Sequence, residues 1–317
     1  MLNDAMNKQV SGAVTTIRLN GFYAGWEQWF LNMSDNHHDS IYCNRDLELR
    51  HLKEAKARNA RINIFGDLFD AMQGRFDPRR SMAELRPEYR RDDYYDFVAN
   101  DLAEFLAPYA DNIDMISDGN HELAVLKNAN TNLVERLVYK LRSETKADIV
   151  HGGYGGWLRY AIHDDSIPTP RQSIKCKYFH GSGGEAPVTR GVIHTNRQAV
   201  YLPDANVVFN GHNHHEYYIP ISRERISNKG ELYMDVQHHL RIAGYKQSYG
   251  DGSSGWEITR GGVPKPIGCV WMRMYYDESS SMVRLQFIPD VIGADPISVN
   301  SNDLYSGKNY ADDPEGE

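Results

Sequence analysis

The sequence predicts an α/β protein that folds as one domain, with a second half rich in strands. Short apolar runs in the first half are bounded by turn residues, which is typical of buried strands. The stretches between these runs repeat apolar residues at helical spacing, and from about residue 148 onward β-type runs broken by glycine take over. With 317 residues, of which 41% are hydrophobic and 25% charged, the chain can bury one large core, and its sequence shows no internal repeat and no clear linker.

The first half should alternate strands and helices. In the stretch 91–110, Tyr94, Val98 and Leu102 recur on one helical stripe, and Pro108 fits an ending near that point. The same reasoning applies to the other segments. We expect strands at residues 26–33, 61–65 and 113–117, and helices at residues 43–60, 91–110 and 132–141.

The second half should consist mainly of strands, with one helix at residues 190–201. Glycines separate its apolar runs, as they do between neighbouring strands. We expect strands at residues 148–162, 173–179, 205–209, 231–237, 269–276 and 282–288. The boundaries that we expect are a flexible N-terminus at residues 1–14, the domain at 15–290 and an acidic, disordered tail at 291–317.

The charge balance and the cysteines limit the classes of function. A formal net charge of −8 argues against a broad basic face for nucleic acid, although a local cationic patch is compatible with it. Cys43, Cys176 and Cys269 are far apart and odd in number, which favours reduced thiols over a disulfide framework. The sequence begins without a signal pattern, and it has no run of about 18 apolar residues. We therefore expect a cytoplasmic protein that does not enter a membrane.

Five of the apolar runs end in residue types that bind metals. Residues at the strand ends of an α/β sheet converge on one rim, where ligands usually bind. Each residue alone has a structural explanation, because Gly-Asp favours turns and a single histidine is more often hydrogen-bonded than ligating. Five such coincidences together favour one shared site. The residues are Asp35 with His37, Asp67 with Asp70, Asn120 with His121, His180, and His212 with His214.

The ligand types favour a pair of divalent cations. Carboxylates and imidazoles without thiolates suit Mn²⁺, Fe or Zn²⁺, and the set is larger than one tetrahedral site needs. Two metals about 3.5 to 4 Å apart can hold a phosphoryl group and lower the pKa of a bound water. The sequence therefore predicts hydrolysis of a phosphoester with two divalent metal ions as cofactors, Mn²⁺ being preferred.

Taken in order, the five blocks resemble the signature of the calcineurin-like metallophosphoesterases. They span residues 35 to 214, about two-thirds of the chain, and each follows an apolar run. The resemblance implies a four-layer αββα sandwich with a dinuclear metal site at the strand ends. The blocks are Asp35-x-His37, Gly66-Asp67-x-x-Asp70, Gly119-Asn120-His121-Glu122, His180 and Gly211-His212-x-His214.

The resemblance also implies a role for each residue. His121 takes the catalytic role on the leaving-group side of the phosphate, and a metal-activated bridging hydroxide is the nucleophile. Asp70 orients the site rather than binding a metal. The first metal is implied to bind Asp35, His37, Asp67 and His214, and the second to bind Asp67, Asn120, His180 and His212.

Residues that contact the substrate are less well defined by the sequence. The arginine-rich stretch 75–91 is either a solvated face or a phosphate-facing rim, with Arg79 and Arg80 as the first candidates. His38 and His215 are further candidates for substrate binding, and each has a structural alternative.

The substrate that we favour is a phosphodiester, in a nucleotide or in nucleic acid. The blocks SDNHHD and DGNHE resemble the diesterase and exonuclease branches of the family more closely than its phosphoprotein phosphatases. The alternatives are a phosphomonoesterase, including a phosphoprotein phosphatase, and a catalytically silent metal-binding scaffold of the same fold. The presence of His121 argues against the scaffold, which has no need for that residue.

Overall fold

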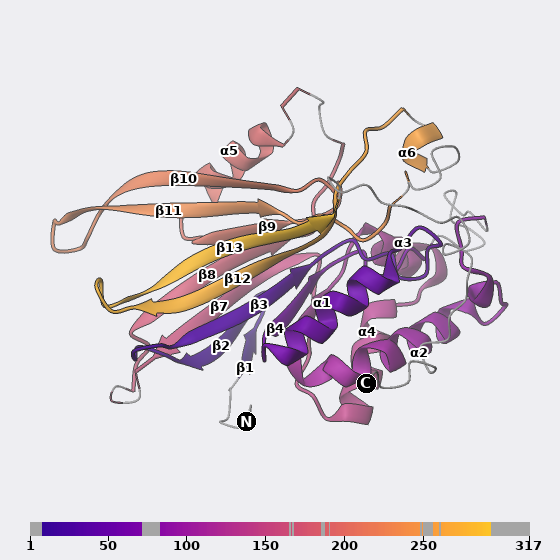
Figure 1. The fold of residues 1–317 in the computed structure, drawn as a ribbon, viewed down its shortest axis with the longest axis horizontal. Helices are drawn as coiled ribbons and strands as arrows, with labels where there is room; N and C mark the ends of the chain where they lie inside the picture. The colour runs from indigo at the N-terminus through magenta and orange to yellow at the C-terminus, as the bar shows by residue number, and fades with distance from the viewer. Residues whose placement is uncertain are drawn as a thin grey trace, which may run out of the picture.

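The computed structural model describes residues 8–71, 83–164, 166, 168–184, 188–189, 191–247, 249, 256–259 and 261–292. Two β-sheets pack face to face, and helices lie on the outer side of each sheet (Figure 1). The order of layers is helix, sheet, sheet, helix. This order confirms the expected α/β class and the four-layer sandwich.

The six-stranded sheet combines the first half of the chain with its last two strands. Its order is β13-β12-β3-β4-β5-β6, and the four strands from β3 to β6 run parallel. β4 and β5 are buried along their whole length, because helices cover one face of the sheet and the second sheet covers the other. The strands are β3 (Glu27–Met33), β4 (Arg61–Phe65), β5 (Ile113–Ser117), β6 (Val150–Gly152), β12 (Ile267–Asp277) and β13 (Met282–Ile292).

Three long helices cover the outer face of this sheet. Asn44 and Asn132 cap two of them, each accepting a hydrogen bond at 3.0 Å from a backbone nitrogen three residues later. Apolar residues on the inner faces of the three helices, such as Leu52, Leu102 and Leu137, form one core cluster with the sheet. The helices are α1 (Arg45–Ala57), α2 (Tyr94–Leu106) and α4 (Leu133–Thr145), with the 3₁₀ turns η1 (Pro87–Tyr89) and η2 (Ala107–Asn112) and the helix α3 (Asn120–Ala129) between them.

The seven-stranded sheet has the order β1-β2-β7-β8-β9-β11-β10, in which β9 runs parallel to both of its neighbours. Leu202, Ala205, Val208 and Trp157 form a small cluster at the end of α5. The single helix α5 thus provides the fourth layer. The elements are β1 (Lys8–Ser11), β2 (Val14–Asn20), β7 (Gly155–His163), β8 (Gln172–Phe179), α5 (Val192–Tyr201), β9 (Val207–Asn210), β10 (Tyr217–Ile226), β11 (Leu232–Arg241) and the short α6 (Trp256–Thr259).

A second core fills the space between the two sheets. Phe30 of β3 lies 4.7 Å from Tyr160 of β7, and Phe65 of β4 stacks on Phe209 of β9 at 5.1 Å, both measured between ring centroids. Phe65 is the last residue of β4 and Phe209 the penultimate residue of β9. Their contact therefore brings the carboxyl ends of strands from both sheets together.

The structure differs from the expected elements at several places, and β1, β2 and α6 were not among the expected elements. Residues 148–162 form two strands in different sheets, because β6 pairs with β5 whereas β7 pairs with β2 and β8. β10 was not expected, since Pro220 interrupts its apolar run and residues 222–225 are polar; Pro220 is tolerated because β10 is an edge strand. α3 was not expected either. The domain also begins before the expected boundary at residue 15, because Lys8 already pairs with β2.

Other expectations concern the cysteines, membranes and the tail. All three cysteines are buried and unpaired, as the sequence indicated. In the part of the chain that the structure describes, no helix is both long and apolar enough to cross a membrane. Residues 293–317 of the expected acidic tail lie outside the described residues.

Candidate metal centre

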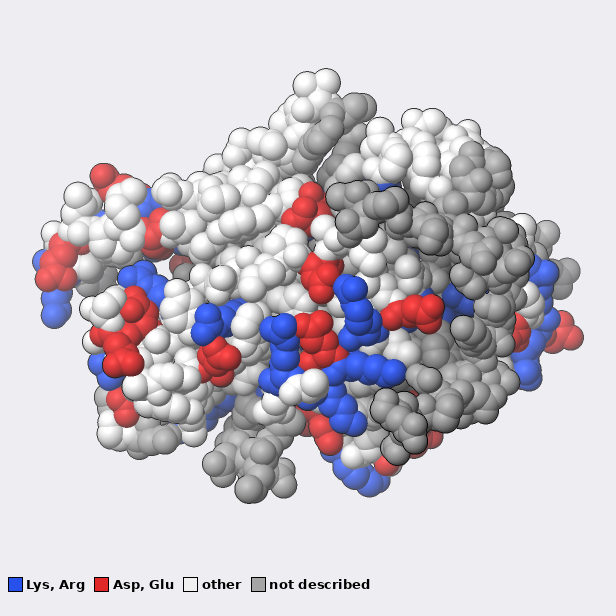
Figure 2. All heavy atoms as spheres, viewed as in Figure 1, with Lys and Arg blue, Asp and Glu red and all other residues white. Residues whose placement is uncertain are grey.

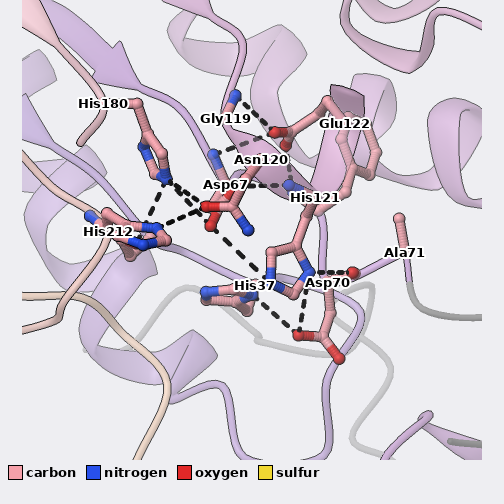
Figure 3. Close-up of polar contacts among 12 residues, drawn as sticks. His37, Asp67, Asp70, Ala71, Gly119, Asn120, His121, Glu122, His180 and His212 are labelled. Carbon is pink, nitrogen blue, oxygen red and sulfur yellow. Dashed lines mark hydrogen bonds and ion pairs between the residues drawn. The ribbon is translucent and has the colours of Figure 1, made fainter. Parts of the chain in front are cut away.

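The five expected blocks follow β3, β4, β5, β8 and β9, the third as the first turn of α3 and the others in loops, and their side chains converge at the carboxyl ends of these strands (Figure 3). Three of the strands belong to the six-stranded sheet and two to the seven-stranded sheet. The cluster therefore lies across the seam between the sheets. The structure brings together Asp35, His37, Asp67, Asp70, Asn120, His121, His180, His212 and His214.

Five of these residues have a backbone conformation that residues other than glycine rarely adopt. Their φ angles lie between 48° and 76°, in the left-handed region. Such a conformation costs on the order of 1 kcal/mol or more per residue and persists where the surrounding structure fixes it, often at functional sites. The turn after each strand directs the side chain into the shared cluster. The residues are Asp35, His37, Asp67, His212 and His214.

A first group of ligand atoms comes from Asp35, His37 and His214. Nε2 of His37 lies 3.2 Å from Nε2 of His214, and Oδ1 of Asp35 lies 3.4 Å from the same His214 nitrogen. On the other side of the His37 ring, Nδ1 lies 2.8 Å from Oδ1 of Asp70. A carboxylate in this position keeps the proton on Nδ1, so the Nε2 lone pair faces the group.

A second group comes from Asp67, Asn120, His180 and His212. Nε2 of His180 lies 3.1 Å from Oδ2 of Asp67 and 3.2 Å from Oδ1 of Asn120. The same Asn120 oxygen lies 2.6 Å from Nδ1 of His212. Nδ1 of His180 donates a hydrogen bond of 2.9 Å to the backbone carbonyl of Phe65, so Nε2 is the nitrogen that faces the group.

Negative charge is concentrated where the two groups meet. Nε2 of His180, in the second group, lies 3.1 Å from Oδ2 of Asp67 and 3.9 Å from Oδ1 of Asp35 in the first group. Burial lowers the pKa of His180, but Asp67 and Asp35 outweigh burial and raise this pKa to about 10. Burial likewise raises the pKa of Asp67, but His180 and His121 lower it well below its usual value. In the metal-free protein, a proton on His180 balances the negative charge of the two carboxylates, and a divalent cation can replace that proton.

The spacing of the ligand atoms fits metal ions. Two nitrogens bound to one ion at about 2.1 Å in a tetrahedral arrangement lie about 3.4 Å apart. The observed separation between the Nε2 atoms of His37 and His214 is 3.2 Å. The donors are carboxylate, imidazole and amide oxygen without a thiolate, a set that suits Mn²⁺, Fe or Zn²⁺. Each of the two groups could hold one ion.

His121 lies at the accessible edge of the cluster. Its ring packs edge-on against His37 with 4.7 Å between the ring centroids, and its Nδ1 donates a hydrogen bond to the backbone carbonyl of Asp70. Nε2, which lies 3.9 Å from Oδ2 of Asp67, remains directed toward the ligand groups. The side chain is 13% exposed, so a substrate can reach it. Burial lowers the pKa of this imidazole, so with the proton on Nδ1 the neutral ring presents a lone pair at Nε2, whereas the doubly protonated ring presents a proton there.

Glu122 ties two of the ligand loops together, a role that the sequence did not reveal. Its Oε2 accepts hydrogen bonds from the backbone nitrogens of Asp67 at 3.1 Å and Gly119 at 2.7 Å, and its Oε1 accepts one from Phe69 at 3.0 Å. The sequence signal that could have indicated this role is the position of Glu122 directly after His121 in the third block. Gly119 allows the close approach, because a Cβ atom there would lie 2.1 Å from Oδ1 of Asp67.

Asp70 lies beside His37 and His121, and its orienting role stays a prediction. It contacts Nδ1 of His37, and its Oδ1 also accepts a hydrogen bond of 3.0 Å from Nζ of Lys246. Lys246 was not singled out from the sequence, since it lies 176 residues after Asp70 and belongs to none of the five blocks.

The expectation that His38 faces the substrate is wrong for this structure. Its side chain is fully buried, with Nδ1 2.8 Å from Oε2 of Glu48 and the ring packed against Phe105. The left-handed turn at His37 sends the two neighbouring side chains in different directions, and α1 supplies the partner of His38. His215 is half-buried, and its substrate role stays a prediction.

The arginine-rich stretch is described only in part. Arg79 and Arg80 lie outside the described residues. Further along, Arg86 donates to two backbone carbonyls at 3.1 Å, and Arg91 pairs with Asp93 at 2.7 Å. These arginines bind the protein itself, which favours the structural interpretation for this part of the stretch.

Comparison with known proteins gave no match to a family model and none to a curated protein. Among solved structures, the chain is similar to a conserved protein from Streptococcus pneumoniae described as a predicted phosphoesterase, with 14% identity and a TM-score of 0.31, over 86% of this chain and 96% of that one. Vps29 from Entamoeba histolytica, solved in complex with Zn²⁺, is 9% identical with a TM-score of 0.35, over 83% and 99% of the two chains. GAP50 of Plasmodium, described as the anchor in the inner membrane complex, is 11% identical with a TM-score of 0.34, over 84% and 87%. Likenesses this low carry no functional conclusion.

Proposed function

We propose that this protein is a phosphoesterase that depends on two divalent metal ions. The observation that supports it is the pair of adjoining ligand groups at the seam between the sheets, one around His37 and His214 and the other around His180 and His212. Mn²⁺ is the preferred ion, and Fe and Zn²⁺ are compatible. In this proposal the first ion binds Asp35, His37, Asp67 and His214, and the second binds Asp67, Asn120, His180 and His212.

The protein's own residues would position the reaction. Bound metal ions would supply a water activated for attack on phosphorus and positive charge for the phosphoryl oxygens. Glu122 holds the loops that carry Asp67 and Asn120, and Asp70 orients His37. Because the Nδ1 proton of His121 is held by a backbone carbonyl, its Nε2 is the nitrogen that would face the leaving-group oxygen, and the doubly protonated ring could give it a proton from there.

A phosphodiester is the substrate class that we propose. A diester carries one negative charge at neutral pH, whereas a monoester carries 1.5 to 2, roughly. Two described cations near the site are engaged within the protein: Lys246 pairs with Asp70 and Glu84, and Arg241 packs over the ring of Tyr217 at 5.1 Å. Burial lowers the pKa of His214, and a third cation, Lys265, lies close enough to that imidazole to lower it further. This arrangement favours the less charged diester.

Nucleic acid, if it is the substrate, would be held by few phosphate contacts. The net charge is −8, and on the face shown in Figure 2 the Lys and Arg side chains are interspersed with Asp and Glu instead of forming a basic stripe. Each neutralised phosphate adds about 0.9 to the slope of log affinity against log salt on duplex DNA. We therefore expect a shallow salt dependence.

A catalytically silent metal-binding scaffold is the alternative from another class. The position of His121 favours the enzyme, because a scaffold gains nothing from a partly exposed imidazole directed at the ligand groups. The alternative within the enzyme class is a phosphomonoesterase.

One assay separates these possibilities. An aryl phosphodiester, an aryl phosphomonoester, a dinucleotide, a single-stranded oligonucleotide and a duplex are compared in Mn²⁺, with and without a chelator. We expect hydrolysis of at least one diester that the chelator abolishes. Monoester turnover far above that of every diester would refute the diester preference. Two bound metals per chain without turnover of any substrate would favour the scaffold.

A further inference from the structure

A lysine from the second half of the chain reaches the back of the candidate metal centre. Nζ of Lys246 lies 3.0 Å from Oδ1 of Asp70 and 3.2 Å from Oε2 of Glu84. The same Asp70 oxygen lies 2.8 Å from Nδ1 of His37 and 3.8 Å from Nδ1 of His121. One carboxylate oxygen thus connects Lys246 with a proposed metal ligand and with the proposed proton donor.

The backbone around Lys246 is held by the loops after β3. The nitrogen of Tyr245 donates to the carbonyl of Asp35 at 2.9 Å, and the nitrogen of Gln247 donates to the carbonyl of Tyr42 at 2.8 Å. The segment that carries Lys246 is therefore fastened on both sides of the lysine. Its ammonium group has a defined position relative to the ligand groups.

Burial makes the charge of Lys246 important for Asp70. The two side chains are 8% and 3% exposed. A carboxylate so well buried needs a compensating positive charge and complete hydrogen bonding to stay in place. Without Lys246, the carboxylates of Asp70 and Glu84 would lose the ammonium group that they share, and Asp70 would no longer be fixed against His37.

We propose that Lys246 is a positioning residue of the metal centre. It fixes the carboxylate of Asp70, so that His37 directs Nε2 toward the first metal. Lys246 itself touches neither the metal nor the substrate. The inference rests on the proposed function, and its test reads metal binding, which can be measured without turnover.

The variant Lys246→Met has a matched control in Lys8→Met. The Lys8 side chain is also 8% exposed and pairs with a buried carboxylate, that of Asp114, at 3.2 Å, but it lies in β1 and outside the centre. We expect Lys246→Met to weaken Mn²⁺ binding about 10- to 100-fold at one of the two sites, the scale for loss of a group that orients a metal ligand. Lys8→Met should keep the wild-type affinity. Calorimetric titration of metal-free protein measures both, and thermal unfolding confirms that each variant folds.

A double variant tests whether Lys246 affects metal binding through Asp70. If Lys246 acts by fixing this carboxylate, Asp70→Asn combined with Lys246→Met should bind Mn²⁺ about as weakly as Asp70→Asn alone. Losses that multiply in the double variant would overturn the inference. Wild-type Mn²⁺ affinity in Lys246→Met would overturn it as well.

Lys246→Arg keeps the charge but changes its shape and reach, and we expect a loss intermediate between wild type and Lys246→Met. If Lys246→Met does not fold, Lys246→Gln, which also removes the charge, takes its place, and wild-type Mn²⁺ affinity in that variant would overturn the inference. In an active protein, Lys246→Met should lower kcat with little change in KM.

The outcomes for the two proposals are distinguishable. A wild-type protein that binds two Mn²⁺ without hydrolysing any phosphoester contradicts the proposed function, while the comparison of metal affinities still decides the role of Lys246. A wild-type protein that binds no divalent metal overturns both.

Discussion

Replacement of Glu122 by glutamine tests how the protein holds the loops that carry its proposed ligands. The side chain is 2% exposed, and its two oxygens accept hydrogen bonds from the backbone nitrogens of Asp67, Phe69 and Gly119. Glutamine has nearly the same shape, so the substitution leaves no cavity. Its amide has only one oxygen, however, and the NH₂ group must face at least one backbone N–H.

The magnitude follows from the number of bonds lost. With the amide oxygen in the place of Oε2, the bonds from Asp67 and Gly119 persist and the bond from Phe69 is replaced by two opposed donors. A hydrogen bond to a charged group contributes about 1.5 to 3 kcal/mol, and a buried donor without a partner costs about 1 to 3 kcal/mol. These contributions overlap, and glutamine also removes a buried charge that is disfavoured at this position, so we expect the free energy of unfolding to fall by about 1 to 3 kcal/mol. The opposite amide orientation would lose two bonds and cost more.

Urea unfolding followed by circular dichroism measures this difference. Burial and the neighbouring Asp67 raise the pKa of Glu122 to about 8, so the measurement is made at pH 9, where the carboxylate predominates. A chelator in every sample removes any contribution from bound metal. Glu135→Gln, at an exposed position of α4, serves as the control and should stay within about 0.5 kcal/mol of wild type. A Glu122→Gln variant as stable as this control would refute the reasoning.

Three further outcomes are expected. Asp67→Asn should lose both metals together, because one carboxylate is proposed to serve both ions; two metals per chain by elemental analysis of this variant would remove the bridging role. His121→Ala should keep its metal content and lose about 10²-fold in kcat, the scale of general acid–base catalysis; if it lost metal but kept its rate per bound metal, His121 would be a ligand. Burial lowers the pKa of His51 in the folded protein from 6.5 to about 4, so the unfolded chain takes up this proton first and stability should fall as the pH drops from 6.5 to 4. His51→Gln should make that fall shallower in urea unfolding at pH 7 and pH 5, and an unchanged fall would contradict the assignment.

The elements with a strong local pattern were predictable from the sequence. The run RINIF at residues 61–65 corresponds to β4 residue by residue, because its apolar residues pack on both faces of a covered strand. The two polar residues of the run are buried with partners: Arg61 pairs with Asp114, and Asn63 donates to Asn32. The stripe of Leu133, Leu137 and Leu141 predicted the helix α4 in the same way. β10 has no such pattern. Its exposed and half-buried residues alternate along an edge of the sheet, where few of them pack on a core.

The residues of the candidate site were predictable from the sequence, but the residues that hold the ligand loops in place were not. The ligand types recur after strands, which is a local signal, and the structure brings all nine expected residues of the blocks together. The supports arise from tertiary contacts: Asp39, for example, accepts hydrogen bonds from the backbone nitrogens of Asp70 at 2.6 Å and Ala71 at 3.0 Å. A single polar residue whose partner is distant in the sequence produces no periodic pattern. For the same reason the sequence did not indicate that Lys246 contacts Asp70. The burial of His38 was equally hidden, because its partner Glu48 lies on α1.

The location of the centre on the seam between the sheets has a consequence for the folding pathway. The facing nitrogens of His37 and His214 belong to residues 177 positions apart. Contacts of such sequence separation form late, because the entropy of closing a long loop is lost before the contact repays it. Until the two sheets dock, the proposed ligands remain divided between them: four follow strands of the six-stranded sheet, and three follow strands of the seven-stranded sheet. Tight metal uptake should therefore appear after most of the helix and strand signal has returned, and its rate would report when the two sheets come together.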